Sequence, residues 1–584
     1  MLKKNCKTLF VISLALVTPR LVHAATVQNF GGGGTPYVSS TCQGTIGTAV
    51  QGSGGPTGGP FIRLTGQTLN NTTSIAFQRS DNGGFTQVSI QFDFRLTPVS
   101  PSNRADGFGV ALLNTVNYDG SGGQCVGSEE PNIPGSFGVG FDIFQGAGEI
   151  NNNHISIHHA NTIQNTIASP IDLGSGQWTH ARIVVRPGAG FSDASIYLTP
   201  NGGAEVPVVV NQAVAGLNPY ESRVYFSART GGQTASHDIA NVNVAYTADP
   251  AVVGSWTGIK NVPTIPIHSM MLPNKKILFW DRNNPPGDII PRIWNPADET
   301  TTSTPNPVKE FFCAGHTFDA QGRVLIFGGH NMSDGNGLNT AFAYDYATNS
   351  FTQLPNMNAG RWYPTNTTLG NGDALVVSGS MTPGNMNQTP QVWQDKTQTW
   401  RTLTSAVRNQ AYYPMMILAP NGQVFNAGPN TDTAFLNTGG TGSWGPAINN
   451  TGGSHDYGTA VMRDGKVTVF GGGFTTNNVE QIDLNSGSPS WAGKAPMAYA
   501  RRQHNGVILA DGNVLITGGS KTPVFNSNAG AIMASELWNA TSQTFTMGAG
   551  MAVSRIYHSE TVLLPDGRVA SLGGGHPAAD AGGG

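Results

Sequence analysis

The sequence predicts an all-β protein in which a β-sandwich is followed by a β-propeller, and three observations indicate this fold class. Of the 584 residues, 77 are Gly and 36 are Pro, while only 11% are charged. This composition is typical of many short strands joined by tight turns. In the first half, apolar and polar residues alternate over 86–96 with the period of a half-buried strand. In the second half, a turn followed by an apolar strand recurs seven times.

The same composition excludes several other classes of protein. A disordered chain is rich in charge and poor in apolar residues, whereas this one has 38% hydrophobic residues, including 10 Trp and 26 Phe. The glycines lack the three-residue period of collagen. With a net charge of −3, the chain has no basic field to attract a nucleic acid, so we expect no nucleic-acid partner.

Residues 1–24 are predicted to be a secretory signal peptide. Three lysines precede an apolar run over 9–17, and small residues mark a cleavage site after Ala24. The apolar run is much shorter than the roughly 20 residues needed to span a membrane, and no later run reaches that length. We therefore expect a secreted protein with no membrane span.

Three cysteines remain after removal of the signal peptide. Cys42 and Cys125 both lie in the first half and are able to pair in an oxidising compartment, but the sequence leaves the pairing open. Cys313 is then the odd cysteine, and an unpaired thiol in an exported protein calls for an explanation.

The predicted sandwich covers 25–247. Five of its segments resemble the legume-type (L-type) lectin family and occur in the order of that family: 105–113, 137–145, 151–159, 194–199 and 223–232. The resemblance implies a jelly-roll (concanavalin-like) sandwich that binds glycans with support from Ca²⁺. It places Asp106 against the sugar, Asp142 and the carbonyl of Phe144 on a metal, and His154 at a transition-metal position. Carboxylate and carbonyl oxygens are suitable Ca²⁺ ligands.

The sequence departs from the lectin pattern at two places. Gly140 and Gly146 stand where the family has an acidic residue and an Asn, and Glu149 and Asn152 are candidates to supply the missing oxygens. The alternative is a sandwich that packs beside a catalytic unit and binds no sugar.

A repeat begins after residue 247 and extends over 248–584. The turn residues of its seven copies are Lys275, Gly322, Gly372, Gly422, Gly465, Gly512 and Gly567. A kelch-like period of about 50 residues is typical of propeller blades with four strands each. We therefore predict a seven-bladed kelch-type β-propeller, in which the last blade is incomplete within this sequence.

Residues at one register of different blades converge on the axis of a propeller. Counting back nine from the turn residues gives Cys313, Tyr363, Tyr413, Asp456, Gln503 and His558, with His504 and Tyr557 one place away. Cys, Tyr and His on one ring differ from the small and apolar residues that fill a core. We expect a chemical site at the mouth of the propeller.

Segments 311–330, 360–372 and 555–569 resemble the galactose oxidase and glyoxal oxidase family of copper radical oxidases. The resemblance implies a redox cofactor in which the sulfur of Cys313 is bonded to the ring of Tyr363. It implies copper ligation by Tyr363, Tyr557 and His558, with Tyr557 as the axial ligand. Second-shell positions of the family fall on Tyr413, Gln503, His504 and Met381.

The residue types fit this chemistry. Imidazole and phenolate are suitable donors for Cu(II), and a thioether-substituted tyrosine supplies the second electron reservoir that a two-electron oxidation needs. Tyr557 would act as general base. The expected reaction oxidises aldehydes or primary alcohols with O₂ and releases H₂O₂.

Two departures separate this chain from the oxidase family. Met381 stands where galactose oxidases carry an aromatic shield, which favours the aldehyde-preferring branch. The family's remaining copper-ligating His comes from an immunoglobulin-like domain after the propeller, for which we expect no counterpart here. Two alternatives follow: a carbohydrate-binding or adhesion protein with an inactive propeller, and a fragment of a longer oxidase.

Overall fold

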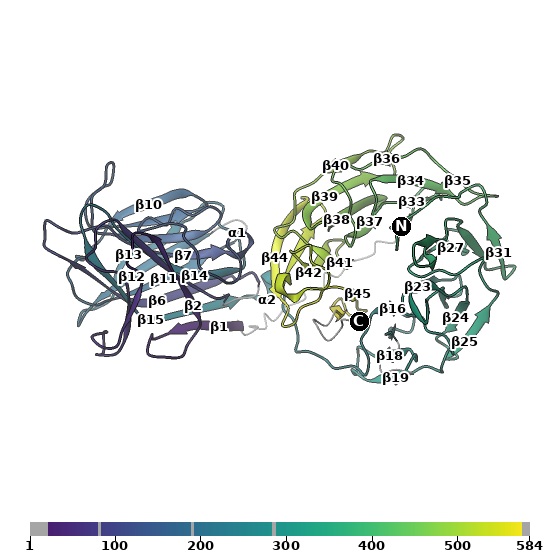
Figure 1. Cartoon of the computed structure of the whole chain (residues 1–584), viewed down its shortest axis with the longest axis horizontal. Coiled ribbons are helices and arrows are strands. Elements are labelled where there is room, and N and C mark those ends of the chain that lie inside the picture. The colour runs from purple at the N-terminus through teal and green to yellow at the C-terminus, as the bar shows by residue number, and fades with distance from the viewer. Residues whose placement is uncertain (1–20, 80–82, 189–191, 283–287, 575–584) are drawn as a thin grey trace, which may run out of the picture. The chain divides into compact units, whose positions relative to one another are not determined.

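The computed structural model describes residues 21–79, 83–188, 192–282 and 288–574 (Figure 1). The chain divides into two compact units, Met1–Ser255 and Trp256–Gly584. Apart from α1 (Thr115–Tyr118), α2 (Pro250–Val253) and a 3₁₀ turn, the regular elements of the described residues are strands. Most of the predicted signal peptide lies outside the described residues, and none of the described helices has the length and apolar character of a membrane span.

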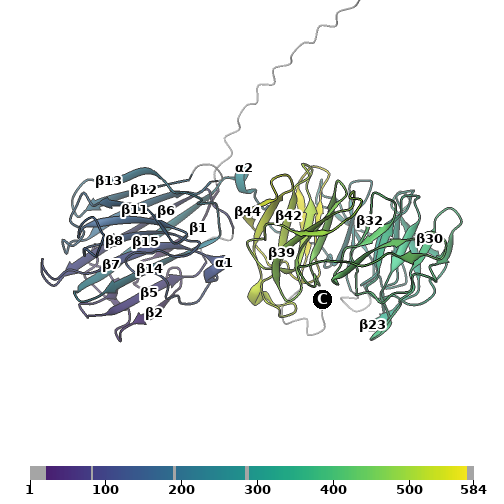
Figure 2. The same cartoon turned by 90° about the horizontal axis from the view of Figure 1, so that it is seen from above.

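The first unit is a sandwich of two antiparallel sheets, which lie one over the other in Figure 2. One sheet consists of β1 (Leu21–Gln28), β3 (Ala49–Gln51), β4 (Phe61–Thr65), β6 (Gln87–Pro98), β11 (Thr179–Arg186), β12 (Asp193–Pro200), β13 (Val206–Ala213) and β15 (Ala235–Ala248). The other consists of β2 (Tyr37–Gln43), β5 (Asn71–Phe77), β7 (Gly107–Asn114), β8 (Phe137–Asp142), β9 (His154–His159), β10 (Thr162–Ala168) and β14 (Ser222–Thr230).

The core of the sandwich follows from the alternation in the sequence. Every second residue of β6 is buried, because successive side chains of a strand point to opposite faces. Phe92 and Phe94 pack against Phe108 of β7 and Phe141 of β8, and the last two rings are stacked at 4.7 Å. Cys42 of β2 forms a disulfide with Cys125. The jelly-roll lectin identity of this sandwich stays a prediction.

The second unit is a ring of sheets around an axis (Figure 1). The first three blades are β16 (His268–Met271), β17 (Ile277–Trp280), β18 (Arg292–Trp294) and β19 (Thr301–Ser303); β20 (Gly315–Phe318), β21 (Val324–Phe327), β24 (Ala341–Asp345) and β25 (Ser350–Leu354); and β26 (Thr365–Thr368), β27 (Ala374–Val377), β30 (Gln391–Gln394) and β31 (Thr399–Thr402). The hairpins β22 (His330–Asn331) with β23 (Ser333–Gly337), and β28 (Ser380–Thr382) with β29 (Asn385–Met386), lie outside the blade sheets.

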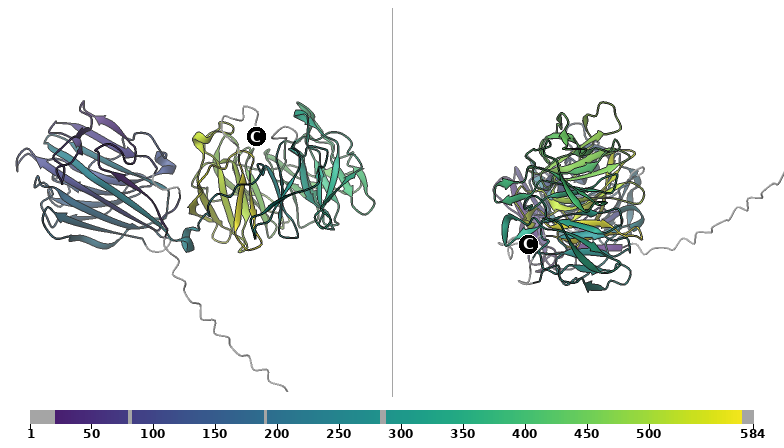
Figure 3. Two further views of the ribbon diagram at one scale, coloured as in Figure 1. Left: turned by 90° about the horizontal axis from the view of Figure 1, so that it is seen from below. Right: turned by 90° about the vertical axis from the view of Figure 1, so that its right-hand side faces the viewer.

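The next three blades have the same organisation. They are β32 (Met416–Leu418), β33 (Val424–Asn426), β34 (Asp432–Asn437), β35 (Ser443–Trp444) and β36 (Ile448–Asn449); β37 (Thr459–Arg463), β38 (Lys466–Gly472), β39 (Thr476–Asp483) and β40 (Trp491–Gly493); and β41 (Arg502–Ile508), β42 (Val514–Ser520), β43 (Ala534–Asn539) and β44 (Thr544–Gly550). Figure 3 shows from the side that blade strands run through the thickness of the ring.

A two-stranded sheet, β45 (Ser559–Leu563) with β46 (Val569–Gly573), follows the six blades. β45 contacts both β41 of the sixth blade and β16 of the first. The all-β propeller is therefore confirmed. The count of seven stays a prediction, because the described part of the chain gives the seventh sheet two strands.

Each blade shares an apolar core with both of its neighbours. On β21, Val324 and Ile326 pack with Trp280 of the first blade. The alternate residues Leu325 and Phe327 pack with Trp393 of the third. Both faces of a blade are thus buried, which explains why the recurring strands of the sequence are apolar without interruption.

Candidate active site

One backbone feature places the residues of the site. In six successive sheets, a residue with positive φ, between 43° and 64°, lies within the first two residues of the innermost strand or up to three places before it: Cys313, Tyr363, Tyr413, Tyr457, Gln503 and His558. Non-glycine residues seldom adopt this conformation, and it clusters at functional sites. The N–H groups of Tyr363, Tyr413 and Gln503 donate to the carbonyls of Cys313, Tyr363 and Tyr457, at 2.8–2.9 Å. These bonds join the loops of the second, third and fourth blades, and those of the fifth and sixth blades.

The structure corrects one member of the predicted ring. Tyr457, rather than Asp456, has the shared conformation. The reason is the turn of the fifth blade, where Arg463 pairs directly with Lys466 and only Asp464 and Gly465 lie between them. This turn has two residues, one fewer than the turns of the other blades. Counting back nine places from Gly465 therefore ends one residue too early, at Asp456.

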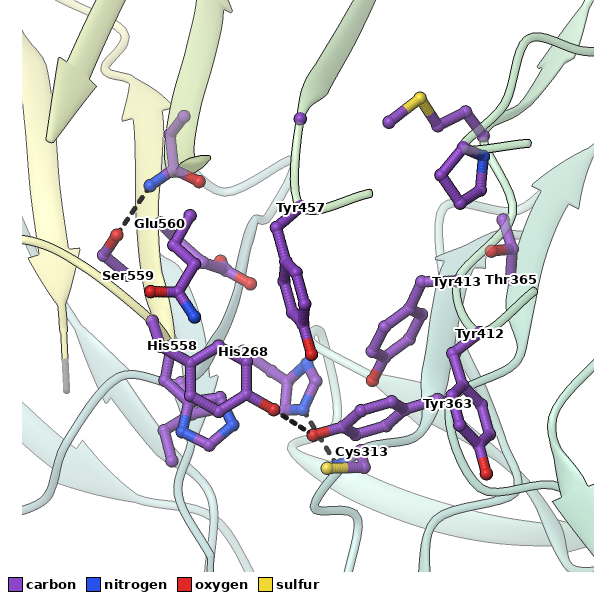
Figure 4. A pocket seen from close by; sticks show the side chains of 18 of the residues that line it. His268, Cys313, Tyr363, Thr365, Tyr412, Tyr413, Tyr457, His558, Ser559 and Glu560 are labelled. Carbon is purple, nitrogen blue, oxygen red and sulfur yellow. Dashed lines mark hydrogen bonds between the residues drawn. The ribbon is translucent and has the colours of Figure 1, made fainter. Parts of the chain in front are cut away.

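Cys313 and Tyr363 come together at the mouth of the propeller. Cys313 is an unpaired cysteine, 1% exposed, and packs in one buried cluster with Tyr363, Ile267 and Phe312. Figure 4 shows its sulfur beside the Tyr363 ring. Burial raises the pKa of the Cys313 thiol and of the Tyr363 phenol. Both groups are therefore neutral in the protein without a metal.

Tyr557 and His558 lie next to this pair. The hydroxyl of Tyr557 forms a hydrogen bond with the hydroxyl of Tyr363, and its ring stacks on His558 with 3.8 Å between centroids. Both ring nitrogens of His558 are buried without a hydrogen-bond partner among the described residues, and burial lowers the pKa of this imidazole to about 3. His558 is a neutral imidazole with a lone pair to donate.

The ring of Tyr363 is covered on its faces by aromatic side chains. Trp362 stacks on it at 3.9 Å and 11°, and Tyr413 at 4.7 Å and 23°. Met381, predicted at the shield position, lies in β28 and does not line the central cavity. The sequence analysis missed Trp362, although its place directly before Tyr363 in the segment GRWYP was visible.

Tyr413, Gln503 and His504, which the family resemblance places around the metal ligands, line a cavity of about 640 Å³. The same cavity is lined by Cys313, Tyr363, Tyr557 and His558. Tyr413 donates its hydroxyl to the carbonyl of Ala314, at 3.3 Å. Gln503 accepts from the N–H of Asn526, also at 3.3 Å. Both nitrogens of His504 are buried without a partner among the described residues.

The cavity therefore collects two phenol oxygens and one imidazole nitrogen, from Tyr363, Tyr557 and His558. Nitrogen and oxygen donors of this kind suit Cu(II), and the unpartnered nitrogens of His558 fit such a ligand. The thiol beside the Tyr363 ring adds a redox-active group. The arrangement is able to hold a transition metal next to an oxidisable tyrosine.

A second candidate site lies in the sandwich. Asp142 and His154 offer donor atoms within 4.8 Å of each other and of Glu130, which the sequence analysis missed because its segment carries no motif. Glu130 faces His154 at 3.4 Å and His158 at 2.6 Å. The Oδ1 atom of Asp142 accepts from the N–H of Phe144 at 2.6 Å, and burial raises the pKa of Asp142 to about 8.

Asp106, the predicted sugar contact, directly precedes β7 and is buried. Its carboxylate lies 3.3 Å from Arg229. Burial and the charge of Glu129 raise its pKa to about 6. Glu149 accepts a hydrogen bond from the N–H of Gly146. Glu149, one of the two candidates to supply the oxygens missing from the lectin pattern, therefore lies next to Gly146.

Comparisons with known proteins match the propeller. A Kelch motif covers residues 320–358. A galactose oxidase of Gibberella zeae (strain PH-1) is 29% identical over 385 residues, covering 58% of this chain and 55% of that enzyme, and a second galactose oxidase sequence of Gibberella zeae gives the same values. The chain thus spans about half the length of the curated relatives it matches. A solved fungal alcohol oxidase of the AA5 family, in complex with copper, is 25% identical with a TM-score of 0.52, covering 56% of this chain and 74% of that one. The propeller is therefore galactose oxidase-like.

Proposed function

We propose that this chain is a copper radical oxidase that oxidises aldehydes or primary alcohols with O₂ and releases H₂O₂. One observation carries the proposal. A buried, unpaired Cys313 lies beside the ring of Tyr363, whose hydroxyl is hydrogen-bonded to Tyr557, and His558 follows with two unpartnered nitrogens. The galactose oxidase and AA5 alcohol oxidase relatives support the same chemistry.

Three of the described residues carry donor groups that suit copper. Tyr363, Tyr557 and His558 would hold it, because their phenol and imidazole groups adjoin one another at the cavity. Copper, when bound, supplies one of the two electron acceptors of the oxidation, and the Cys313–Tyr363 thioether would supply the other. Copper also favours the phenolate forms of the two tyrosines, whose pKa values burial raises in its absence.

The chain's own groups would orient the substrate and move its proton. Tyr557 is placed at the cavity and its hydroxyl already shares a hydrogen bond, so its oxygen would accept the hydroxyl proton of a primary alcohol or an aldehyde hydrate. Trp362 and Tyr413 cover the faces of the Tyr363 ring and exclude water from it. The cavity volume of about 640 Å³ suits a small substrate.

The sandwich would tether the oxidase to glycans and raise the local substrate concentration. Glu130, Asp142 and His154 provide the donor set for a Ca²⁺ or transition-metal ion, and Asp106 would contact the sugar. The cleavage pattern of residues 1–24 supports export as the route to such glycans.

One observation favours a second candidate function, a carbohydrate-binding or adhesion protein whose propeller is inactive. Among the described residues, one imidazole stacks on the ring of Tyr557, that of His558. The other histidines that line the cavity make no ring contact with Tyr363 or Tyr557 in the described part of the chain. Weak copper binding would leave the glycan-binding unit as the working part.

One experiment distinguishes the two functions. The full chain is loaded with Cu(II), bound copper is counted, and H₂O₂ is measured with small aldehydes and primary alcohols. We expect turnover in the wild type and none in His558→Ala, while His180→Ala, a change in the sandwich, keeps it. Intact copper binding without H₂O₂ release would leave the carbohydrate-binding function in its place.

A further inference from the structure

We propose that the propeller holds a second divalent transition-metal site, formed by His268, His316 and Glu560. These residues lie on β16, β20 and β45, the innermost strands of three neighbouring sheets. One nitrogen of each imidazole and one oxygen of the carboxylate lie within 4.8 Å of one another. The group shares none of its members with Cys313, Tyr363, Tyr557 and His558, and the inference does not rest on the proposed oxidase activity.

The two imidazoles are held in place by aromatic packing. His268 stacks on Trp280, with 5.3 Å between centroids and 21° between planes, and His316 meets the same indole edge-on at 5.2 Å. The centroids of the two imidazoles are 5.7 Å apart. Because rigid neighbours fix both rings, little side-chain freedom is lost when a ligand joins them.

The half-buried carboxylate of the group has no balancing charge within the described part of the chain. Glu560 accepts a hydrogen bond from the hydroxyl of Ser269, but it takes part in no ion pair within the described part of the chain, whereas the buried Glu536 pairs with Arg501 at 2.9 Å. Nδ1 of His316 is likewise buried without a hydrogen-bond partner there. A half-buried carboxylate without a cationic partner and an unpartnered imidazole nitrogen are groups that a cation satisfies.

The ligand types point to the class of cation. Two imidazoles and one carboxylate form the set that binds Zn²⁺ and similar ions, with an open fourth position. Tetrahedral ligands at about 2.1 Å from the metal are about 3.4 Å apart. The separations here, all within 4.8 Å, therefore have to shorten by at most about 1.4 Å. All three residues line the central cavity, so water or a small ligand can take the open position.

The site is linked to Cys313 through its backbone. The N–H of Cys313 donates to Nε2 of His268 at 2.9 Å, so Nε2 lacks a proton and Nδ1 carries it in the metal-free protein. A cation bound to His268 has to replace either that N–H or the Nδ1 proton. A cation at Nε2 would break the hydrogen bond that fixes the Cys313 loop, whereas a cation at Nδ1 would leave this bond in place.

Zinc binding by the full chain tests this proposal. Metal-free wild type, His316→Gln and Glu560→Gln are dialysed against Zn²⁺, and bound zinc is measured by mass spectrometry. We expect each variant to hold one equivalent less than the wild type at a zinc concentration that saturates the latter, with affinity lowered at least about tenfold. Glu480→Gln is the matched control, since Glu480 is a buried glutamate of the fifth blade with its own partners, and it should bind like the wild type.

A further variant separates this site from the proposed copper site. His558→Ala should retain the zinc equivalent that Glu560→Gln loses. If His316→Gln does not fold, the zinc content of Glu560→Gln tests the proposal. The visible absorption bands of bound Co²⁺ are then a second readout of metal ligation by nitrogen. Equal zinc content in Glu560→Gln and wild type, or loss of the equivalent in His558→Ala, would overturn the proposal.

Discussion

The backbone N–H of Tyr363 donates to the carbonyl of Cys313 at 2.9 Å, and both residues have positive φ. This bond joins the loops that precede the innermost strands of two adjacent blades. It holds the sulfur of one residue beside the ring of the other without help from the metal. The prerequisite for a thioether is therefore built into the propeller scaffold.

Replacing Tyr557 by Phe should abolish most of the activity. The change removes the hydroxyl that is bonded to Tyr363 and would act as general base, but keeps the ring that packs on His558 and Phe525. We expect kcat to fall by about 10²–10⁴-fold, measured as H₂O₂ release by the copper-loaded enzyme. Tyr344→Phe, at a buried tyrosine bonded to Asn349, is the control. A variant with wild-type kcat would remove Tyr557 from the mechanism.

The stability of the sixth blade should depend on Glu536. This carboxylate pairs with Arg501, and both side chains are at most 1% exposed. Glu536→Ala leaves the guanidinium buried without its partner, which costs about 3–5 kcal/mol of the free energy of unfolding. Urea denaturation measures the difference. Asp566→Ala breaks a half-exposed pair with Arg568 and should cost far less, because solvent screens an exposed ion pair; equal losses in the two variants would contradict this account.

Acid should weaken the sandwich through His237. This side chain is fully buried on β15 against Thr65, and burial, with Arg63 nearby, lowers its pKa from 6.5 to about 3. Between these values the unfolded chain binds a proton that the folded one does not. The free energy of unfolding therefore falls with decreasing pH, by about 1.4 kcal/mol per pH unit for this group.

The pH dependence can be assigned by substitution. His237→Asn should flatten the slope of unfolding free energy against pH by one proton in this range, as followed by denaturant titration at several pH values. Parallel curves for the variant and the wild type would show that His237 does not carry the effect.

Calcium should stabilise the sandwich through Asp142. Its carboxylate is buried close to Glu130 and His154, and a cation bound only by the folded state at 100 times its Kd adds about 2.7 kcal/mol to the free energy of unfolding. Asp142→Asn should lose this gain, and EDTA should abolish binding to a glycan array. Glycan binding that survives EDTA would contradict the calcium prediction.

The sequence predicted the propeller because the repeat is local. Each turn glycine and its strand lie within a few residues, so the pattern is visible without knowledge of distant contacts. The two-residue turn at Asp464 and Gly465 escaped the count, since a one-residue difference in loop length does not change the turn signal. As a result Asp456 was placed where the structure has Tyr457.

Residues that act only through long-range contacts were harder to predict. Glu130 lies in an irregular segment and meets His154 only after β9 is added to its sheet. His268 is a buried and His316 a half-buried strand residue, and their meeting depends on the closure of the ring. By contrast, Cys313, Tyr363 and His558 were found together because they share one register of the repeat, and Tyr557 is one place away from it.

The mass of the Cys313–Tyr363 peptide pair tests the central claim most directly. Incubation of the copper-loaded full chain with O₂ should form a carbon–sulfur bond, with loss of the thiol hydrogen and one ring hydrogen of Tyr363 while O₂ is reduced to H₂O₂. Proteolysis after reduction should then release the two peptides as one species, lighter than their sum by two hydrogen atoms. Cys313→Ser should give separate peptides. Separate, unmodified peptides from copper-loaded wild type would contradict the account.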